Sequence, residues 1–213
     1  AHGSVQPTKQ VTAMSIESTQ VEAEVAQLID RARAAQAEFD HYDQSRVDEV
    51  VTAVGSAVIN DVNNRRLAEQ AVADTGLGDV EDKFAKNRRK TLGLLRDLRG
   101  AKSVGVVAEY PDLGLVEIAR PVGVVAAIVP STNPVATPVN KTINALKGRN
   151  AIILAPSPKG QRVGAALIEL IHAELDRVGA PRDLVQMLPI PANKAHTAEL
   201  LRQADLVVAT GSQ

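Results

Sequence analysis

Polar side chains gather in short loops that directly follow apolar runs of the sequence. The first loop, residues 129–134, reads Val-Pro-Ser-Thr-Asn-Pro, and similar loops follow at 155–160, 189–193 and 210–212. The side-chain amide of Asn133 could donate a hydrogen bond to an oxyanion that develops during acyl transfer. An asparagine before a proline is more often a turn residue, so from the sequence alone both interpretations of Asn133 stay open.

The later loops offer groups that could contact a nucleotide. Ser157, between Pro156 and Pro158, forms part of a rigid loop or contacts a ribose or phosphate. Gly211 and Ser212 could direct backbone N–H groups at a pyrophosphate if a helix follows them. Neither the glycine-rich dinucleotide motif nor the phosphate-binding loop motif occurs in the sequence, so any nucleotide would bind in another way.

Composition excludes several kinds of chemistry. The 213 residues contain no cysteine, so neither a disulfide nor a thiol nucleophile can come from them. The four histidines lack the spacing of a metal site, and we expect no metal. A net charge of -1 with two Phe, two Tyr and no Trp argues against nucleic-acid binding. Because no apolar run is long enough to span a membrane and no signal peptide is present, we expect a soluble, cytoplasmic protein with no membrane partner.

The first half of the chain reads as a helical layer. Residues 1–14 are polar and aperiodic, and we interpret them as a tag and flexible lead-in. From 15 to 102 the apolar spacing is helical, with Ser45 capping the second helix and Asp79 capping a later helix that stops at Gly100. That later helix would bury three leucines, Leu92, Leu95 and Leu98.

The period changes after this layer. Residues 103–120 predict a protruding β-hairpin with a Pro-Asp-Leu-Gly turn. In residues 121–213, continuous apolar runs alternate with helical patterns, which predicts an α/β fold with a doubly wound parallel sheet that binds ligands at the carboxyl ends of its strands. One of these helices would have Thr137 as N-cap and Pro138 at its first position. The four apolar runs are 122–129, 151–155, 184–188 and 206–209.

Charged residues cluster in two stretches of the helical layer. We interpret these stretches as solvated helix faces that pair with each other or with another subunit, and polyphosphate binding is the weaker alternative. The basic stretch contains Lys83, Lys86, Arg88, Arg89, Lys90, Arg96, Arg99 and Lys102, and the acidic one contains Glu22, Glu24, Asp30, Glu38 and Asp40.

Two separated parts of the sequence resemble a known family. The stretches 121–134 (PVGVVAAIVPSTNP), 145–153 (ALKGRNAII) and 156–158 (PSP) resemble the coenzyme-binding domain of the aldehyde dehydrogenase superfamily. Together with 74–87 (DTGLGDVEDKFAKN), they are similar to its CoA-acylating branch, which includes acetaldehyde, propionaldehyde and sulfoacetaldehyde dehydrogenases. The resemblance extends over 15–213 and implies a Rossmann-like sheet in an incomplete aldehyde dehydrogenase fold.

The resemblance also implies a reaction. A small aldehyde, NAD or NADP, and coenzyme A as co-substrate give an acyl-CoA and the reduced cofactor through a thioester on a cysteine. Asn133 matches the amide that stabilises the oxyanion. The positions that match the cofactor-binding residues are Ser131, Thr132, Pro156, Ser157, Pro158, Gly211 and Ser212.

The family pattern implies more about the whole protein. Relatives that hydrolyse the thioester usually carry Lys where Ala155 stands and Glu near Pro158, so this chain resembles the acylating branch. Many acylating members have His where Ser157 stands, which leaves the substrate open. The hairpin implies a homodimer or homotetramer. Because the family's cysteine lies further along, we expect an N-terminal part without the catalytic domain, inactive alone. The alternatives are a CoA-independent aldehyde or semialdehyde dehydrogenase and a non-catalytic nucleotide-binding or oligomerisation module.

Overall fold

A four-stranded parallel sheet forms the centre of the molecule. The computed structural model describes the backbone of residues 8–210 and the side chains from residue 18 onward. The strands lie in the order β5 (Val185–Met187), β4 (Ala151–Pro156), β3 (Val124–Val129) and β6 (Leu206–Ala209). β3 and β4 are almost entirely buried because helices cover both faces of the sheet. The four predicted strands and the parallel α/β fold are therefore confirmed.

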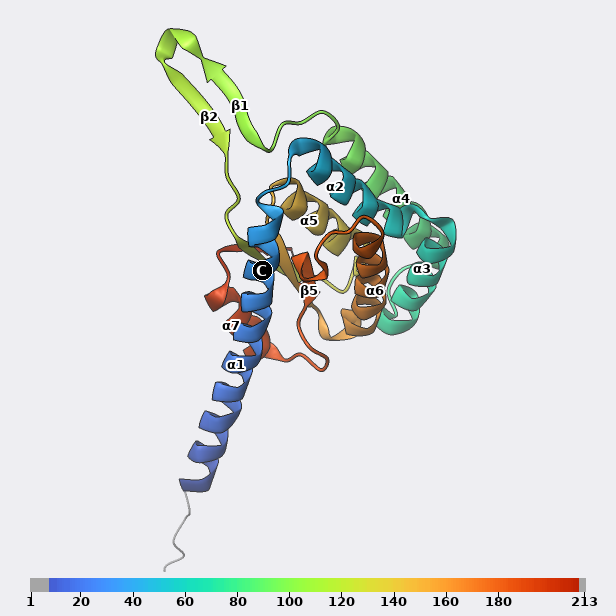
Figure 1. The fold of residues 1–213 in the computed structure, drawn as a ribbon. Helices are drawn as coiled ribbons and strands as arrows, with labels where there is room; N and C mark the ends of the chain where they lie inside the picture. The colour runs from blue at the N-terminus through green and yellow to red at the C-terminus, as the bar shows by residue number, and fades with distance from the viewer. Residues whose placement is uncertain (1–7, 211–213) are drawn as a thin grey trace, which may run out of the picture.

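Two helices cover each face of this sheet (Figure 1). On one face lie α5 (Ala136–Lys147) and α6 (Gln161–Arg177), and on the other lie α1 (Thr8–Phe39) and α7 (Lys194–Gln203). The apolar stripes of these helices pack against the strands and exclude water from the β-ladder. Single-turn helices η2 (Pro158–Gly160) and η3 (Arg182–Leu184) join β4 to α6 and α6 to β5.

An outer helical layer packs over α5 and α6. It consists of α2 (Gln44–Ile59), α3 (Asp61–Thr75) and α4 (Val80–Asp97). The valines of α2 are completely or nearly completely buried, as their spacing predicts. A buried amide pair ties α4 to α3, because Asn87 Nδ2 donates to Asn64 Oδ1 at 3.0 Å. α4 is therefore held in place by specific polar contacts.

The hairpin projects away from this body (Figure 1). β1 (Gly105–Tyr110) pairs antiparallel with β2 (Leu115–Ala119) through the turn η1 (Pro111–Leu113). Gly114 adopts the left-handed conformation, φ 62°, that closes the turn. Several apolar side chains of the hairpin are exposed, as they would be in a strand pair that leaves its own core. The predicted hairpin and its turn are confirmed.

Three helix starts differ from those expected. α1 begins at Thr8, within the segment expected to be a flexible lead-in. The N-cap of α2 is Asp43 rather than Ser45, and its carboxylate accepts from the Arg46 backbone N–H at 2.8 Å. α5 begins at Ala136 without a side-chain cap, so Thr137 does not cap it. The predicted N-cap Asp79 of α4 is correct, since it accepts from two backbone N–H groups.

Apolar residues are exposed at two places, on α4 and on the edge strand β6. Leu92 of α4 is 41% exposed, although its spacing predicts burial. The buried face of α4 is instead polar and contains Lys83, Asn87 and Thr91. At the edge of the sheet, all four residues of β6 are exposed. Among the residues that the structure describes, no helix is long and apolar enough to cross a membrane.

Candidate functional site

The loops expected to carry the chemistry meet at the carboxyl edge of the sheet. Register places Val129, the last residue of β3, beside Pro156 at the end of β4. Ile128 pairs with Ala209 of β6, so Thr210 follows at the same edge. Parallel strands deliver their following loops to one edge, and the structure brings the Asn133, Ser157 and Thr210 loops together in this way. Gly211 and Ser212 lie outside the described residues.

The amide of Asn133 has a defined orientation. Lys86 on α4 donates from Nζ to Asn133 Oδ1 at 3.3 Å. An ammonium group can only donate, so the atom that it faces must be the amide oxygen. The Nδ2 amide nitrogen of Asn133 is left without a partner among residues 18–210. The chain therefore presents an amide donor, fixed through its oxygen, at the loop that follows β3.

A second lysine holds the backbone of the same loop. Lys83 Nζ donates to the carbonyl oxygen of Thr132 at 3.1 Å. The Lys83 side chain is buried, and burial, followed by the nearby charge of Lys86, lowers the pKa of its amine. Placing a desolvated ammonium here costs free energy, which its contact with the carbonyl partly offsets. Lys83 and Lys86 lie on one face of α4, three residues apart, and both hold the β3–α5 loop.

A third lysine joins β3 to the edge strand β6 below the loop. Lys141 of α5 donates from Nζ to the carbonyl oxygens of Ile128 and Val208, the latter at 2.9 Å. Burial lowers the pKa of the Lys141 amine. Both carbonyls belong to residues near the carboxyl ends of β3 and β6. Lys141 therefore fixes the spacing between the strands that lead to Asn133 and Thr210.

A pocket of about 410 Å³, which we call the lysine pocket, opens beside Asn133, between α4 and α5. Three of the residues that line it are lysines, and none is acidic. Asn140 also lines the pocket, and its Oδ1 atom is buried without a hydrogen-bond partner in the range 18–210. A second hollow, of about 670 Å³, continues along α4 and shares Lys90 and Asn140. The pocket is large enough for a small organic molecule and favours negative charge.

The loop after β4 lies on the opposite side of Asn133 from this pocket. The Ser157 backbone N–H donates to the carbonyl oxygen of Val129 at 3.0 Å, which ties the two strand ends together. A side chain at Gly160 would approach Ser157 Oγ to 3.2 Å and Pro134 Cβ to 3.5 Å. Ser157 Oγ is buried and has no hydrogen-bond partner among the residues that the structure describes. The hydroxyl thus retains hydrogen-bonding capacity at a strand end.

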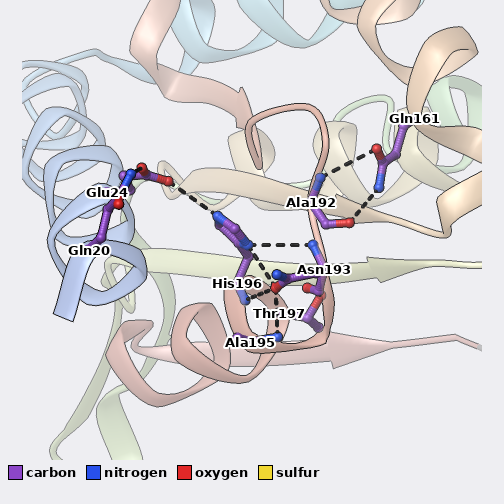
Figure 2. Close-up of polar contacts among 8 residues, drawn as sticks. All are labelled: Gln20, Glu24, Gln161, Ala192, Asn193, Ala195, His196 and Thr197. Atoms are coloured by element: carbon purple, nitrogen blue, oxygen red, sulfur yellow. Dashed lines mark hydrogen bonds and ion pairs between the residues drawn. The ribbon is translucent and has the colours of Figure 1, made fainter. Parts of the chain in front are cut away.

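The loop after β5 is held by neutral and ionic side chains (Figure 2). Gln161, the first residue of α6, donates to the carbonyl oxygen of Ala192 at 2.9 Å and accepts from its N–H at 3.4 Å. Asn193 caps α7 by accepting from the backbone N–H groups of Ala195 and His196. His196 Nε2 lies 3.2 Å from Glu24 Oε2 of α1. These contacts connect the loop to both layers that flank the sheet.

The sequence prediction missed the lysines that line or support the site. It assigned the basic stretch of α4 to a solvated face that pairs with the acids of α1 or with another subunit. Within the described residues the first pairing is wrong, because Glu22 pairs with Arg202 of α7, while Arg88 of α4 pairs with Asp61 of α3. Lys83 and Lys86 point to the β3–α5 loop instead. Their spacing along one helix face was the available signal.

The remaining predicted residues are distributed around these loops. Ser131 and Thr132 lie in the turn before α5, Pro156 ends β4, and Pro158 begins η2. The structure brings all of them to the carboxyl edge, although none of them lines the lysine pocket. Among the described residues, no group of three or more His, Cys, Asp or Glu could hold a metal ion.

Comparison with known proteins gives consistent matches. A sulfoacetaldehyde dehydrogenase (acylating) of Cupriavidus necator is 62% identical over 94% of this chain and 41% of its own length. An acetylating aldehyde dehydrogenase from Geobacillus thermoglucosidasius matches with TM-score 0.83 and 34% identity, over 90% of this chain and 42% of that one. A propionaldehyde dehydrogenase from Rhodopseudomonas palustris with bound propionyl-CoA matches with TM-score 0.76 and 28% identity, over 88% and 41% of the two chains.

These matches identify the family of the chain and show how much of each relative it covers. The chain spans about two fifths of the length of the relatives that it matches. The model of the aldehyde dehydrogenase family matches residues 2–213. The predicted family is confirmed, and the fold agrees with the solved structures. The chain belongs to the aldehyde dehydrogenase family.

Proposed function

We propose that the complete protein is an acylating aldehyde dehydrogenase and that this chain supplies its coenzyme-binding part. The reaction converts an aldehyde, NAD or NADP and coenzyme A into an acyl-CoA, the reduced coenzyme and a proton. The 62% identity to a sulfoacetaldehyde dehydrogenase (acylating) supports this reaction and a sulfonated aldehyde as the substrate. A cysteine outside these 213 residues would add to the aldehyde carbon, since the chain contains none. The same proposal includes action in the cytoplasm.

The orientation of Asn133 is the observation on which the proposal rests. When a nucleophile adds to an aldehyde, negative charge develops on the carbonyl oxygen and needs a hydrogen-bond donor in place. Asn133 can serve as this donor through Nδ2, because Lys86 occupies Oδ1. The nearby ammonium also makes the region positive and further favours an oxyanion. The chain thus provides a donor that needs no reorientation during the reaction.

The opposite side of Asn133 suits the coenzyme. We assign Ser131, Thr132, Pro156, Ser157 and Pro158 to its walls, and Gly211 and Ser212 to the start of the pyrophosphate contact. Ser157 Oγ is a buried hydroxyl without a partner in the described part of the chain, which fits a site for a polar ligand. When bound, the coenzyme would accept the hydride. The residues of this chain would bind and orient it beside the β3–α5 loop, while the lysine pocket on the other side of Asn133 admits the aldehyde.

The test is an assay of the complete protein with sulfoacetaldehyde and NAD or NADP, with and without coenzyme A. We expect reduced coenzyme to form only when coenzyme A is present, with the sulfoacetyl thioester as the product identified by mass spectrometry. Rapid coenzyme reduction without coenzyme A, with the free carboxylate as product, would contradict the acylating reaction. Absence of turnover with any aldehyde would contradict the dehydrogenase function.

A further inference from the structure

The pocket beside Asn133 has more positive charge than its structural contacts use. Lys141 donates to two strand carbonyls, and Lys86 donates to Asn133 Oδ1. Lys90 lines the same pocket, is exposed, and has no hydrogen bond or ion pair to any residue in the range 18–210. One lysine at the site is therefore available for a ligand.

Lys90 also has a suitable position relative to the reacting end of a substrate. It follows Lys86 by four residues on α4, so the two side chains lie on one face of the helix, about 6 Å apart along its axis. Lys86 touches Asn133, the proposed oxyanion donor. A molecule whose carbonyl oxygen reaches Asn133 would thus extend its other end toward Lys90. That spacing suits a short aldehyde with one or two carbons between the carbonyl and a charged group.

The other residues that line the pocket are also suited to an anionic ligand. The residues that line it include Lys86, Lys90 and Lys141 and no carboxylate. Asn140 also lines the pocket, where its Nδ2 group can donate to an anion and its Oδ1 can only accept. A lysine ammonium binds a sulfonate or carboxylate through short, charge-assisted hydrogen bonds, whereas a neutral alkyl tail would leave Lys90 unused.

We propose that Lys90 binds the anionic tail of the aldehyde and so selects sulfonated or carboxylated short-chain aldehydes over neutral ones. This inference rests on the proposed function, because it assigns a specificity residue to the aldehyde pocket of that reaction. Lys90 attracts the substrate and holds its tail, while the bond changes at the carbonyl carbon leave the lysine unaltered. The preference for an anionic aldehyde would then come from α4, outside the loops that bind the coenzyme.

The experiment compares two aldehydes in the complete protein with saturating NAD and coenzyme A. Sulfoacetaldehyde is the anionic substrate, and propionaldehyde is a neutral aldehyde with a methyl group in place of the sulfonate. We expect Lys90→Met to lower kcat/KM for sulfoacetaldehyde by on the order of tenfold or more, the loss typical of a hydrogen bond to a charged group. Propionaldehyde turnover should be unchanged, and Lys90→Arg should retain most of the preference for sulfoacetaldehyde.

The matched control is Lys102→Met, which removes an exposed lysine from the loop after α4, outside the pocket. This substitution should leave kcat/KM for both aldehydes unchanged. A second measurement uses ethanesulfonate, an unreactive anion, as an inhibitor. Ethanesulfonate should compete with sulfoacetaldehyde in the unmodified enzyme and bind more weakly to Lys90→Met. Competition in the unmodified enzyme tests the pocket even if a variant folds poorly.

Several results would overturn the assignment of Lys90. These are equal losses for both aldehydes, no loss for either, a higher KM for NAD or coenzyme A instead of the aldehyde, or inhibition by ethanesulfonate that does not compete with sulfoacetaldehyde. A higher coenzyme KM would mean that Lys90 contacts a phosphate. Failure of the unmodified enzyme to turn over either aldehyde would instead contradict the proposed function itself.

Discussion

The two sides of the Asn133 loop are built from different interactions. On the α4–α5 side, three lysine ammonium groups, those of Lys83, Lys86 and Lys141, donate to oxygens of the strand ends and the loop. On the β4–β5 side, the loops are held mainly by backbone hydrogen bonds and by the neutral amide of Gln161, and one contact between Glu24 and His196 joins α1 to the start of α7. Burial lowers the pKa of two of those lysines, so the charged side has a desolvation cost that the neutral side avoids.

This difference distinguishes residues that support catalysis from residues that support the fold. A neutral amide such as Gln161 can hold a loop without the cost of desolvating an ammonium group, so stability alone does not explain the lysines. A reaction that develops negative charge does explain them, because fixed positive groups stabilise that charge when it appears. We therefore expect substitutions at Lys86 and Asn133 to affect catalysis, and substitutions at Lys141, which joins two strands, or on the neutral side to affect mainly stability.

The largest effect should come from the donor itself. In the complete protein, Asn133→Ala removes the proposed hydrogen bond to the oxyanion, and we expect kcat to fall on the order of 10²- to 10³-fold. Steady-state kinetics with sulfoacetaldehyde measure the loss, and thermal unfolding checks that the variant is folded. A loss below about tenfold would show that Asn133 is a turn residue only.

Removal of the lysine that orients this amide should have the next largest effect. Lys86→Met frees Asn133 Oδ1, and we expect kcat to fall about tenfold while KM for the coenzyme stays unchanged. Lys86→Arg retains a donor and should recover part of the activity. A higher coenzyme KM with an unchanged kcat would assign Lys86 to coenzyme binding instead.

The strand contact predicts a change in stability. Lys141→Met leaves the carbonyl oxygens of Ile128 and Val208 without their donor, and we expect the free energy of unfolding to fall by about 1 kcal/mol. Denaturant unfolding of the complete protein measures it. Lys159→Met is the control, because Lys159 is exposed on η2 and makes no such contact. Equal stability of the two variants would contradict the role of Lys141.

The smallest expected effect lies on the neutral side and depends on pH. A hydrogen bond from Gln20, followed by the contact with His196, lowers the pKa of the Glu24 carboxyl. The folded state therefore favours the carboxylate. This contribution to stability is present above the ordinary pKa of a glutamate and is lost as the pH falls through the lowered value. Glu24→Gln should make unfolding less dependent on pH in that acidic range, and an unchanged dependence would contradict the contact.

The sheet could be predicted because burial on both faces makes β3 and β4 continuous apolar runs, which the sequence displays directly. Asn133 could be placed at a strand end for the same reason. The roles of Lys83 and Lys86 could not, because a lysine on a helix normally faces water, and only the packing of α4 against α5 turns these two toward the loop.

The caps show the same limit at shorter range. Asp79 is the single capping residue directly before its helix, so the sequence identifies it. Asp43 and Ser45 are both good caps, and the backbone selects Asp43. Asp40 and Glu24 also look alike in the sequence, as acids of one charged stretch, yet Asp40 pairs with Arg149 and Glu24 with His196, through contacts between residues far apart in the sequence.

A double-mutant cycle between Lys86 and Asn133 tests most directly whether the lysine acts through the amide. The rates of the unmodified protein, Lys86→Met, Asn133→Ala and the double variant are compared with saturating sulfoacetaldehyde, NAD and coenzyme A. If Lys86 works by orienting Asn133, its substitution should cost nothing further once Asn133 is alanine, so the double variant should match Asn133→Ala. Losses that multiply in the double variant would show that the two residues act independently and would contradict the proposed site.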